Sequence, residues 1–222
     1  MRAAQLYLAG YNSAQLFAWS WVLVTSCSAA LSSPALSPAA AATYAAVYRV
    51  VSACQSATLL ETVHALAGLT RSGVAGNFAQ WAGRTHCWFV LTQVAALQSN
   101  PATLALLLAW SLSDTVRYSW AALTALGICP RSLTWLRYTV FIPLYPAGTA
   151  AELTLLVRAL PAAAAGAVVR RLSLPNALNF SFDYSFFLLF VLIIYPGAWL
   201  TLYKHVFKQR AKLFGVDAKK QR

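Results

Sequence analysis

Six apolar stretches alternate with short polar separators along the chain, and each is close to the length that crosses a lipid bilayer. They cover residues 13–31, 43–66, 78–97, 102–126, 133–160 and 182–206. A bilayer-spanning helix needs about 20 mostly apolar residues, so each stretch predicts a transmembrane helix. The separators contain the turn-forming runs "SSPALSP", "SNP", "CPRS" and "LSLPNALNFS". The pattern predicts an all-α integral membrane bundle of six transmembrane helices in a single domain, residues 1–222.

The composition supports a membrane environment, because 59% of the residues are hydrophobic and only 10% are charged. A soluble domain carries about 25% charged residues. Seven of the 17 Lys and Arg residues lie between Lys204 and Arg222, so much of the net charge of +12 belongs to the end of the chain. A basic segment after an apolar span, here the tail 207–222, is typical of the cytosolic flank of a membrane protein. It does not require a nucleic-acid partner.

An even number of spans places both termini on the same side of the membrane. Most of the basic residues then fall on that side, which predicts cytosolic termini, although Arg170 and Arg171 fall on the other. A cleaved signal peptide is a less favoured alternative for the first stretch, because its apolar part contains Trp19 and Trp21. The tryptophans mostly suggest lipid-facing and interfacial positions.

Ionisable residues inside the apolar stretches are the main clue to function. A charge in the middle of a bilayer costs about 2.5–3.5 kcal/mol, so such groups usually face the interior of a bundle. The ionisable residues inside the predicted spans are Glu61, His64, Arg84, Asp114, Arg117, Arg137 and Glu152. Most fall in the predicted cytosolic halves of their helices, which predicts a polar chamber that opens toward the cytosol.

Structural and functional roles remain open for these charges. Asp114 and Arg117 are three residues apart and can neutralise each other on one helix face. Glu61 can pair with Arg84 or Arg137 across helices. Neither pairing excludes the lining of a site.

The segment "HALAGLTR", residues 64–71, has the outline of a phosphatase signature, but Ala65 occupies the position of the nucleophilic cysteine. Phosphatase chemistry by that route is excluded, since the nucleophile is missing. His64 is then interpreted as an interfacial residue. Arg71 and Arg131 are interpreted as basic flanking residues or as contacts of an anionic substrate. The cysteines and histidines show no metal-ligand spacing, so no metal is expected.

The segment "YPAGTAAE" places Tyr145 and Glu152 seven residues apart. On a helix this is about two turns, so both lie within about 20° of one face and about 10 Å apart along the axis. Pro146 and Gly148 between them interrupt regular packing and allow a substrate to approach the backbone. A buried carboxyl group beside a tyrosine hydroxyl is suited to elimination next to a carbonyl. The spacing alone does not distinguish such an enzyme from a transporter.

Several segments together resemble the 3-hydroxyacyl-CoA dehydratase family of the very-long-chain fatty acid elongation cycle, also called protein tyrosine phosphatase-like proteins. The matching stretches are "LLETVHALAGLT", "QWAGR", "AWSLSDTVRYSW", "LRYTVFIPLYPAGTAAEL" and "YKHVFKQRAK". The resemblance covers most of the second to sixth predicted spans. It is weakest before residue 40 and in the loop 161–180.

The resemblance implies a catalytic pair in the family's YPxGxxxE pattern, formed by Tyr145 and Glu152, with Gly148 also matching. The positions that it implies as a supporting polar group are Glu61, Arg84, Asp114, Arg117 and Tyr118. Asp114 departs from the family, which usually has Glu there. Ala65 and Arg71 also differ from the family's common Cys and Pro.

The activity that the resemblance implies is that of a carbon–oxygen lyase, which dehydrates a long-chain (3R)-3-hydroxyacyl-CoA to the trans-2-enoyl-CoA in the third step of the cycle. No cofactor is expected, because CoA is part of the substrate. Candidate contacts of the CoA phosphates are Arg71, Arg131 and Arg137. The expected partners are membrane lipids and the elongase, ketoacyl reductase and enoyl reductase of the cycle. A non-catalytic scaffold of that complex and a small lipid carrier or transporter remain alternatives.

The family also implies an endoplasmic reticulum membrane protein with both termini in the cytosol. The last four residues, "KKQR", resemble a dilysine retrieval signal for that compartment, with Lys219 and Lys220 at the required places.

Overall fold

The computed structural model describes residues 3–169, 172 and 181–220, with side chains described as far as Gly215. This part of the chain folds into seven α-helices, and its only β-type pairing is an isolated bridge between Leu172 and Phe182. The helices are α1 (Ala3–Ser32), α2 (Leu36–Leu66), α3 (Val74–Gln93), α4 (Ala95–Gln98), α5 (Pro101–Ala125), α6 (Arg131–Ala164) and α7 (Tyr184–Lys220). The predicted all-α class is confirmed.

Each of the six predicted stretches corresponds to one long helix, and the polar separators end the helices where turn chemistry requires it. Asn100 caps α5, because its side chain accepts a hydrogen bond from the Ala102 backbone N–H at 2.9 Å. Gly68 and Gly127 follow α2 and α5 with φ of 69° and 77°, the left-handed conformation that commonly ends a helix. The short helix α4 follows α3 directly.

Three helices are clearly longer than predicted. α1 begins at Ala3 rather than near residue 13, α2 begins at Leu36 rather than near residue 43, and α7 continues through most of the basic tail as far as Lys220. Lys219 and Lys220 of the retrieval-like sequence belong to the last turn of α7, but their side chains lie outside the described ones, as do Arg170 and Arg171.

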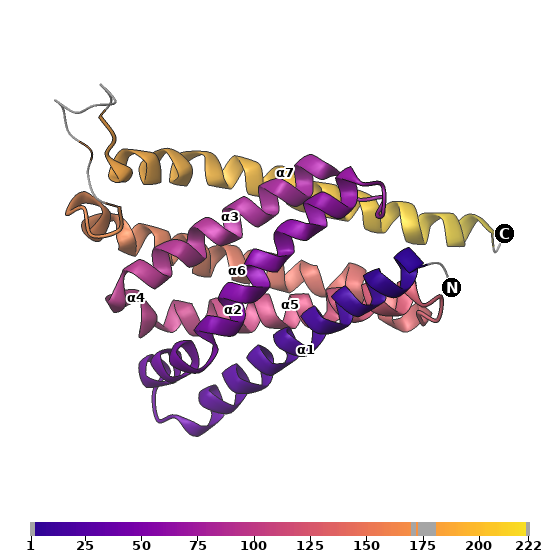
Figure 1. Cartoon of the computed structure of the whole chain (residues 1–222), viewed down its shortest axis with the longest axis horizontal. Coiled ribbons are helices and arrows are strands. Elements are labelled where there is room, and N and C mark those ends of the chain that lie inside the picture. The colour runs from indigo at the N-terminus through magenta and orange to yellow at the C-terminus, as the bar shows by residue number, and fades with distance from the viewer. Residues whose placement is uncertain (1–2, 170–171, 173–180, 221–222) are drawn as a thin grey trace.

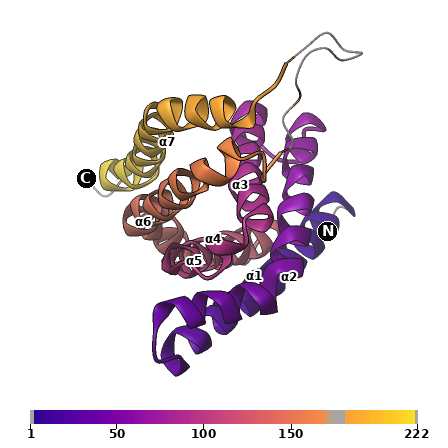
Figure 2. The ribbon, with the colours of Figure 1, turned by 90° about the vertical axis from the view of Figure 1, so that its left-hand side faces the viewer.

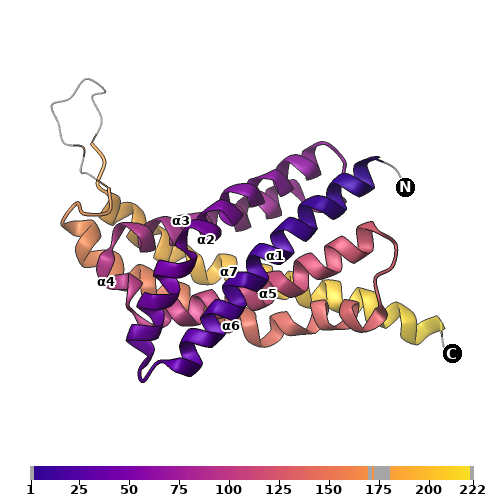
Figure 3. The same ribbon diagram turned by 60° about the horizontal axis from the view of Figure 1, so that its bottom comes forward.

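The long helices run alternately up and down, so both termini and the α2–α3 and α5–α6 turns lie at one end of the bundle (Figures 1 and 3). α1 packs against α5 and α2, while α6 packs between α5 and α7. Seen from its end, the bundle arranges α3, α5, α6 and α7 in a ring, with α1 and α2 to one side (Figure 2). α7 packs mainly against α6.

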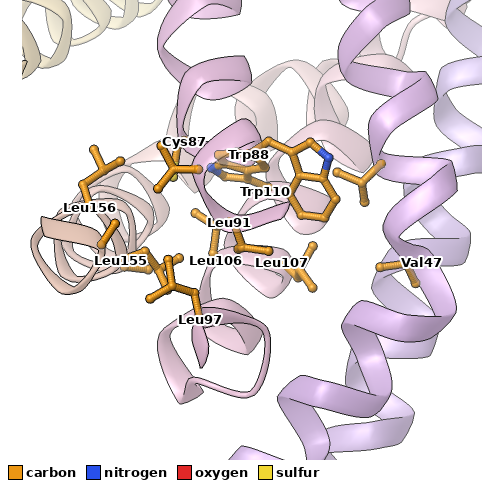
Figure 4. Packing of buried hydrophobic residues seen from close by; sticks show 14 of the residues in the cluster. Val47, Cys87, Trp88, Leu91, Leu97, Leu106, Leu107, Trp110, Leu155 and Leu156 are labelled. Carbon is orange, nitrogen blue, oxygen red and sulfur yellow. The ribbon is translucent and has the colours of Figure 1, made fainter. Parts of the chain in front are cut away.

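The core lies between α2, α3, α5 and α6, where leucines interlock with the indoles of Trp88 and Trp110 (Figure 4). Trp19 of α1 is also in the core, with 1% of its surface exposed. These three tryptophans are therefore not lipid-facing, in contrast to the general expectation for this residue type.

The outer faces of several helices carry large apolar side chains. Phe17, Leu31 and Ile193 are 75%, 88% and 78% exposed. Three helices are long and apolar enough to cross a membrane, within Ala3–Ser32, Arg131–Ala164 and Tyr184–Gly215. Exposed apolar surface of this extent fits a membrane protein, because lipid can cover it.

Candidate active site

A cavity of about 340 Å³ lies between α3, α5, α6 and α7. Its walls are mostly apolar. The polar and aromatic side chains that line it are Gln80, Arg84, Trp110, Ser113, Tyr145, Thr149, Glu152, Phe190, Tyr195 and Trp199. The structure thus places Tyr145 and Glu152 on one cavity, as the two-turn spacing on α6 requires. Gly148 lies between them on the same wall.

The Glu152 side chain is buried, and each of its two carboxylate oxygens accepts a hydrogen bond. Trp110 on α5 donates from its indole nitrogen to Oε1 at 2.8 Å. Tyr195 on α7 donates from its hydroxyl to Oε2. The carboxylate is therefore oriented by two helices other than its own.

Neither donor was singled out by sequence analysis. Trp110 lies four residues before Asp114 on the same helix, and this spacing could have indicated that it shares the interior face. Tyr195 lies in a continuous apolar run with no polar neighbour at helical spacing, so the sequence contains no signal for its contact with α6.

The Tyr145 ring stacks against two aromatic rings of α7. Its centroid is 5.8 Å from that of Tyr203 and 6.5 Å from that of Trp199, with interplanar angles of 9° and 26°. Tyr203 is fixed in turn by a hydrogen bond of 3.0 Å from its hydroxyl to the Ile142 carbonyl oxygen. The Tyr145 hydroxyl has no hydrogen-bond partner within the described part of the chain, so it is available to a molecule in the cavity.

A network of charged side chains lies next to the cavity, where α2, α3 and α5 meet. Asp114 accepts hydrogen bonds from Arg84 at 2.6 Å and from Arg117 at 2.9 Å. Arg117 also donates to both oxygens of Glu61, at 2.7 and 2.9 Å, and Tyr118 donates to Glu61 at 2.6 Å. The five supporting positions implied by the family resemblance thus form one connected group. The predicted neutralisation of Asp114 by Arg117 on one helix face is confirmed.

The predicted pairing of Glu61 with Arg84 or Arg137 is wrong, because Glu61 meets Arg117 instead. Arg84 is held by Asp114. The guanidinium of Arg137 lies 4.2 Å from the centroid of the Trp120 ring. These partners follow from how the helices are rotated about their axes, which the sequence does not specify.

Arg84 connects the network to the cavity. Its guanidinium lies 4.3 Å from the centroid of the Trp110 ring, and the same ring donates to Glu152. Arg84 also lines the cavity wall. The expected single polar chamber is therefore divided into a mostly apolar cavity that holds Tyr145 and Glu152 and an ion-pair network, with Arg84 and Trp110 between them.

His64 lies in the last turn of α2 and is buried, with only 3% of the residue exposed. Its Nε2 lies 2.9 Å from the Tyr7 hydroxyl, and the Tyr11 ring packs edge-on against it at 5.0 Å. α1 begins earlier than expected, and this additional length brings Tyr7 over His64.

Arg71 and Arg131 are exposed, in the α2–α3 turn and at the first position of α6. They lie at the end of the bundle that carries both termini (Figure 1). Arg71, Arg131 and Arg137 do not line the cavity, so any contact with a substrate would involve a part that extends beyond it.

Among the described residues, no group of three or more His, Cys, Asp and Glu side chains is placed to hold a metal ion. The site consists of a carboxylate and a phenol on one apolar cavity, a pair suited to proton transfer.

The family model of the protein tyrosine phosphatase-like proteins, PTPLA, matches residues 55–216, a range that contains the site's charged residues and both members of the Tyr–Glu pair. The chain belongs to this family. In this PTPLA-family protein Ala65 stands at the position of a phosphatase nucleophile, so the family's phosphatase-like description does not assign that chemistry here.

Relatives of this PTPLA-family protein match it over nearly its whole length. A rice protein named very-long-chain (3R)-3-hydroxyacyl-CoA dehydratase PASTICCINO 2A is 35% identical over 210 residues, which cover 94% of this chain and 92% of the rice protein. The mouse very-long-chain (3R)-3-hydroxyacyl-CoA dehydratase 2 is 33% identical over 211 residues, 95% of this chain and 81% of the mouse protein. The human protein of the same name is 32% identical over the same extent. No solved structure matches the chain.

Proposed function

We propose that this protein is a very-long-chain (3R)-3-hydroxyacyl-CoA dehydratase, a carbon–oxygen lyase of fatty acid elongation. Its relatives carry that name, and the match to them covers most of their length. The observation that carries the proposal is the joint presence of Tyr145 and Glu152 on one mostly apolar cavity of a membrane protein. The cavity suits an acyl chain, and the two side chains suit proton transfer beside a thioester.

Glu152 is the base in this proposal. Both of its oxygens accept hydrogen bonds, from Trp110 and Tyr195, as an ionised carboxylate requires. Each oxygen keeps a free lone pair that can take the proton from C2, which the neighbouring thioester makes acidic. The positive charge of Arg84 beside the cavity favours the negative charge that develops on the thioester oxygen.

Tyr145 is the acid. Its hydroxyl, unpaired within the described part of the chain, gives its proton to the C3 hydroxyl group as the C3–O bond breaks. Water leaves and the C2–C3 double bond forms. The cycle closes when the proton taken up by Glu152 returns to the Tyr145 oxygen.

The ion-pair network supports this site through Arg84. Asp114 binds both arginines, at 2.6 and 2.9 Å, although it is one methylene shorter than the Glu usual in the family. This geometry supports full activity with Asp at that position.

CoA is part of the substrate, and we propose no other cofactor. Arg71, Arg131 and Arg137 are the candidates for its phosphates, because they lie near the end of α2 and in the first turns of α6, at the same end of the bundle.

The finer topology belongs to the same proposal. All six long helices cross the membrane in one domain, with both termini in the cytosol, and the protein resides in the endoplasmic reticulum. The up-and-down order of the helices and the common end of the termini support this (Figure 1). The dilysine-like Lys219 and Lys220 would return the protein to that compartment, where the other elongation enzymes are its expected partners.

Replacement of the catalytic pair tests the proposal. Tyr145→Phe and Glu152→Gln should each lower the conversion of a long-chain (3R)-3-hydroxyacyl-CoA to its enoyl product by about 100-fold or more, the usual contribution of a general acid or base. The measurement is enoyl-CoA formation by the purified protein in detergent or lipid, normalised to folded protein.

Tyr184→Phe is a matched control. Tyr184 lies on α7 outside the cavity, and its hydroxyl is 2.6 Å from His86 Nε2. This variant should keep wild-type turnover.

Full activity in either Tyr145→Phe or Glu152→Gln would overturn the catalytic assignment. Substrate binding without enoyl formation by the wild type would favour a lipid carrier, and rescue of elongation by both inactive variants would favour a scaffold.

A further inference from the structure

One face of α7 forms a complete wall of the cavity. Its lining residues recur at the i, i+4 spacing of a single helix face and are Phe190, Val191, Ile194, Tyr195, Ala198, Trp199 and Leu202. Tyr195 is near the middle of this wall and is the only hydroxyl-bearing residue in it. A hydroxyl group at that place needs a partner, and in the described structure its hydrogen bond is not to another residue of the wall.

The partner of Tyr195 is Glu152, the only carboxylate among the described residues that line the cavity. Tyr195 donates to Oε2 while Trp110 donates to Oε1. A carboxylate with a single donor can turn about its terminal bond, whereas donors on both oxygens, from α5 and α7, define the plane of the group. The remaining lone pairs then point in fixed directions.

We infer that Tyr195 is a positioning residue of the dehydratase, which orients the Glu152 carboxylate toward C2 of the substrate. The inference rests on the proposed function and extends the site from the α6 pair to α7. The Tyr195 proton is engaged with Glu152, so Tyr195 does not act as the acid. Tyr145 is the phenol free for that role.

The aromatic contacts of α7 agree with this role. Trp199 lies one turn beyond Tyr195, and its ring stacks on Tyr145 at 6.5 Å and on Tyr203 at 4.9 Å. α7 therefore contacts both members of the catalytic pair, the carboxylate through a hydrogen bond and the phenol through ring stacking. α6 carries the reacting groups, and α7 holds them in place.

Tyr195→Phe tests the inference, because it removes the hydroxyl and keeps the ring in the cavity wall. We expect kcat to fall roughly 10-fold to 100-fold, since misplacement of a catalytic group by about 1 Å costs up to about 100-fold. KM should stay within about twofold, because binding in the apolar cavity is retained. With substrate deuterated at C2, the isotope effect on kcat should be at least as large as in the wild type, because removal of that proton is the step that slows.

Tyr184→Phe is again the matched control, being the same change on the same helix, with loss of one hydrogen bond to α3. Both variants are compared for thermal stability and for the folded fraction after size-exclusion chromatography. A positioning role lowers kcat per folded enzyme in Tyr195→Phe alone.

Four outcomes would overturn the inference. Unchanged kcat in Tyr195→Phe would show that the hydrogen bond has no catalytic consequence. A loss as deep as that of Tyr145→Phe would make Tyr195 a reacting group. A loss explained by less folded protein would make it structural, and a smaller isotope effect would place the defect in another step. In each of these cases the wild type still forms enoyl-CoA, which separates the result from failure of the proposed function. A wild type that does not dehydrate the substrate would overturn both the proposed function and this inference.

Discussion

At the scale of single residues, the surroundings of a side chain decide which of two similar groups reacts. Tyr145 and Tyr195 both line the cavity, but only the Tyr195 hydroxyl is engaged with Glu152 within the described structure. In the proposed mechanism the two phenols therefore have different roles, one chemical and one positional. Spacing and family resemblance identified Tyr145, because its partner is on the same helix. Spacing and resemblance did not indicate Tyr195, because its partner Glu152 is on another helix.

Asp114 offers a test at the same scale, since it is 1% exposed and lies between Arg84 and Arg117. Asp114→Asn should destabilise the protein by about 3–5 kcal/mol, because the largely buried Arg84 then loses its counter-charge, while Arg117 keeps only Glu61. A lower midpoint of thermal unfolding in detergent would report this.

Asp114→Glu is the control for that change, because it keeps the charge and restores the residue usual in the family. We expect turnover within a few-fold of the wild type and little change in stability. An Asn variant as stable as the Glu variant would contradict the structural importance of this charge.

At the scale of helices, the pattern of apolar stretches predicted the elements well and their ends less well. Asn100 caps the start of α5, and Gly127 follows its end with a positive φ. Both residue types favour these positions through local chemistry, so the sequence indicates the limits of this helix directly. The early start of α1 has no such marker. Its first turns are held by a tertiary contact, that of Tyr7 with His64 of α2.

Substitution of Gly148 tests how closely the α6 wall of the cavity fits the substrate. A Cβ atom at this position would lie 3.7 Å from that of Ala109, an ordinary contact, so Gly148→Ala should fold normally. The added methyl group narrows the cavity beside Tyr145 and Glu152, and we expect a loss of roughly 10-fold in kcat/KM, the usual effect of one extra carbon in a fitted pocket.

Gly148→Leu should abolish turnover on long-chain substrate while the folded fraction falls only modestly. Thermal unfolding and enoyl-CoA formation, measured on the same preparations, separate the two effects. Wild-type activity in the Leu variant would mean that the substrate does not pass this wall.

At the scale of the whole molecule, the alternating helices bring both termini and two turns to one end (Figure 3). Cys129 lies in the α5–α6 turn at that end and is partly exposed, whereas Cys54 and Cys87 are buried. A native thiol is therefore available as a reporter of sidedness.

In sealed endoplasmic reticulum vesicles with the cytosolic face outward, Cys129 should react with a membrane-impermeant maleimide. The variant Ser33→Cys, in the turn between α1 and α2 at the other end, should be labelled at its new thiol only after the membrane is permeabilised. Cys27, which is exposed on α1, is replaced by Ser in every variant, and Cys129→Ser provides the background in both cases. The reverse pattern of labelling would invert the proposed topology.

The sequence alone predicted the helices and the alignment of Tyr145 with Glu152 on one face of α6. Both follow from rules that act within one segment of the chain, since a helix that crosses a bilayer needs about 20 apolar residues and an α-helix completes a turn about every 3.6 residues. It also indicated the Asp114–Arg117 contact, three residues apart on α5. The pairing of Glu61 with Arg117 and the contacts of Trp110 and Tyr195 with Glu152 are evident only from the three-dimensional structure. Those contacts depend on how each helix is rotated and tilted against its neighbours, and apolar packing of many side chains sets that geometry rather than any local signal.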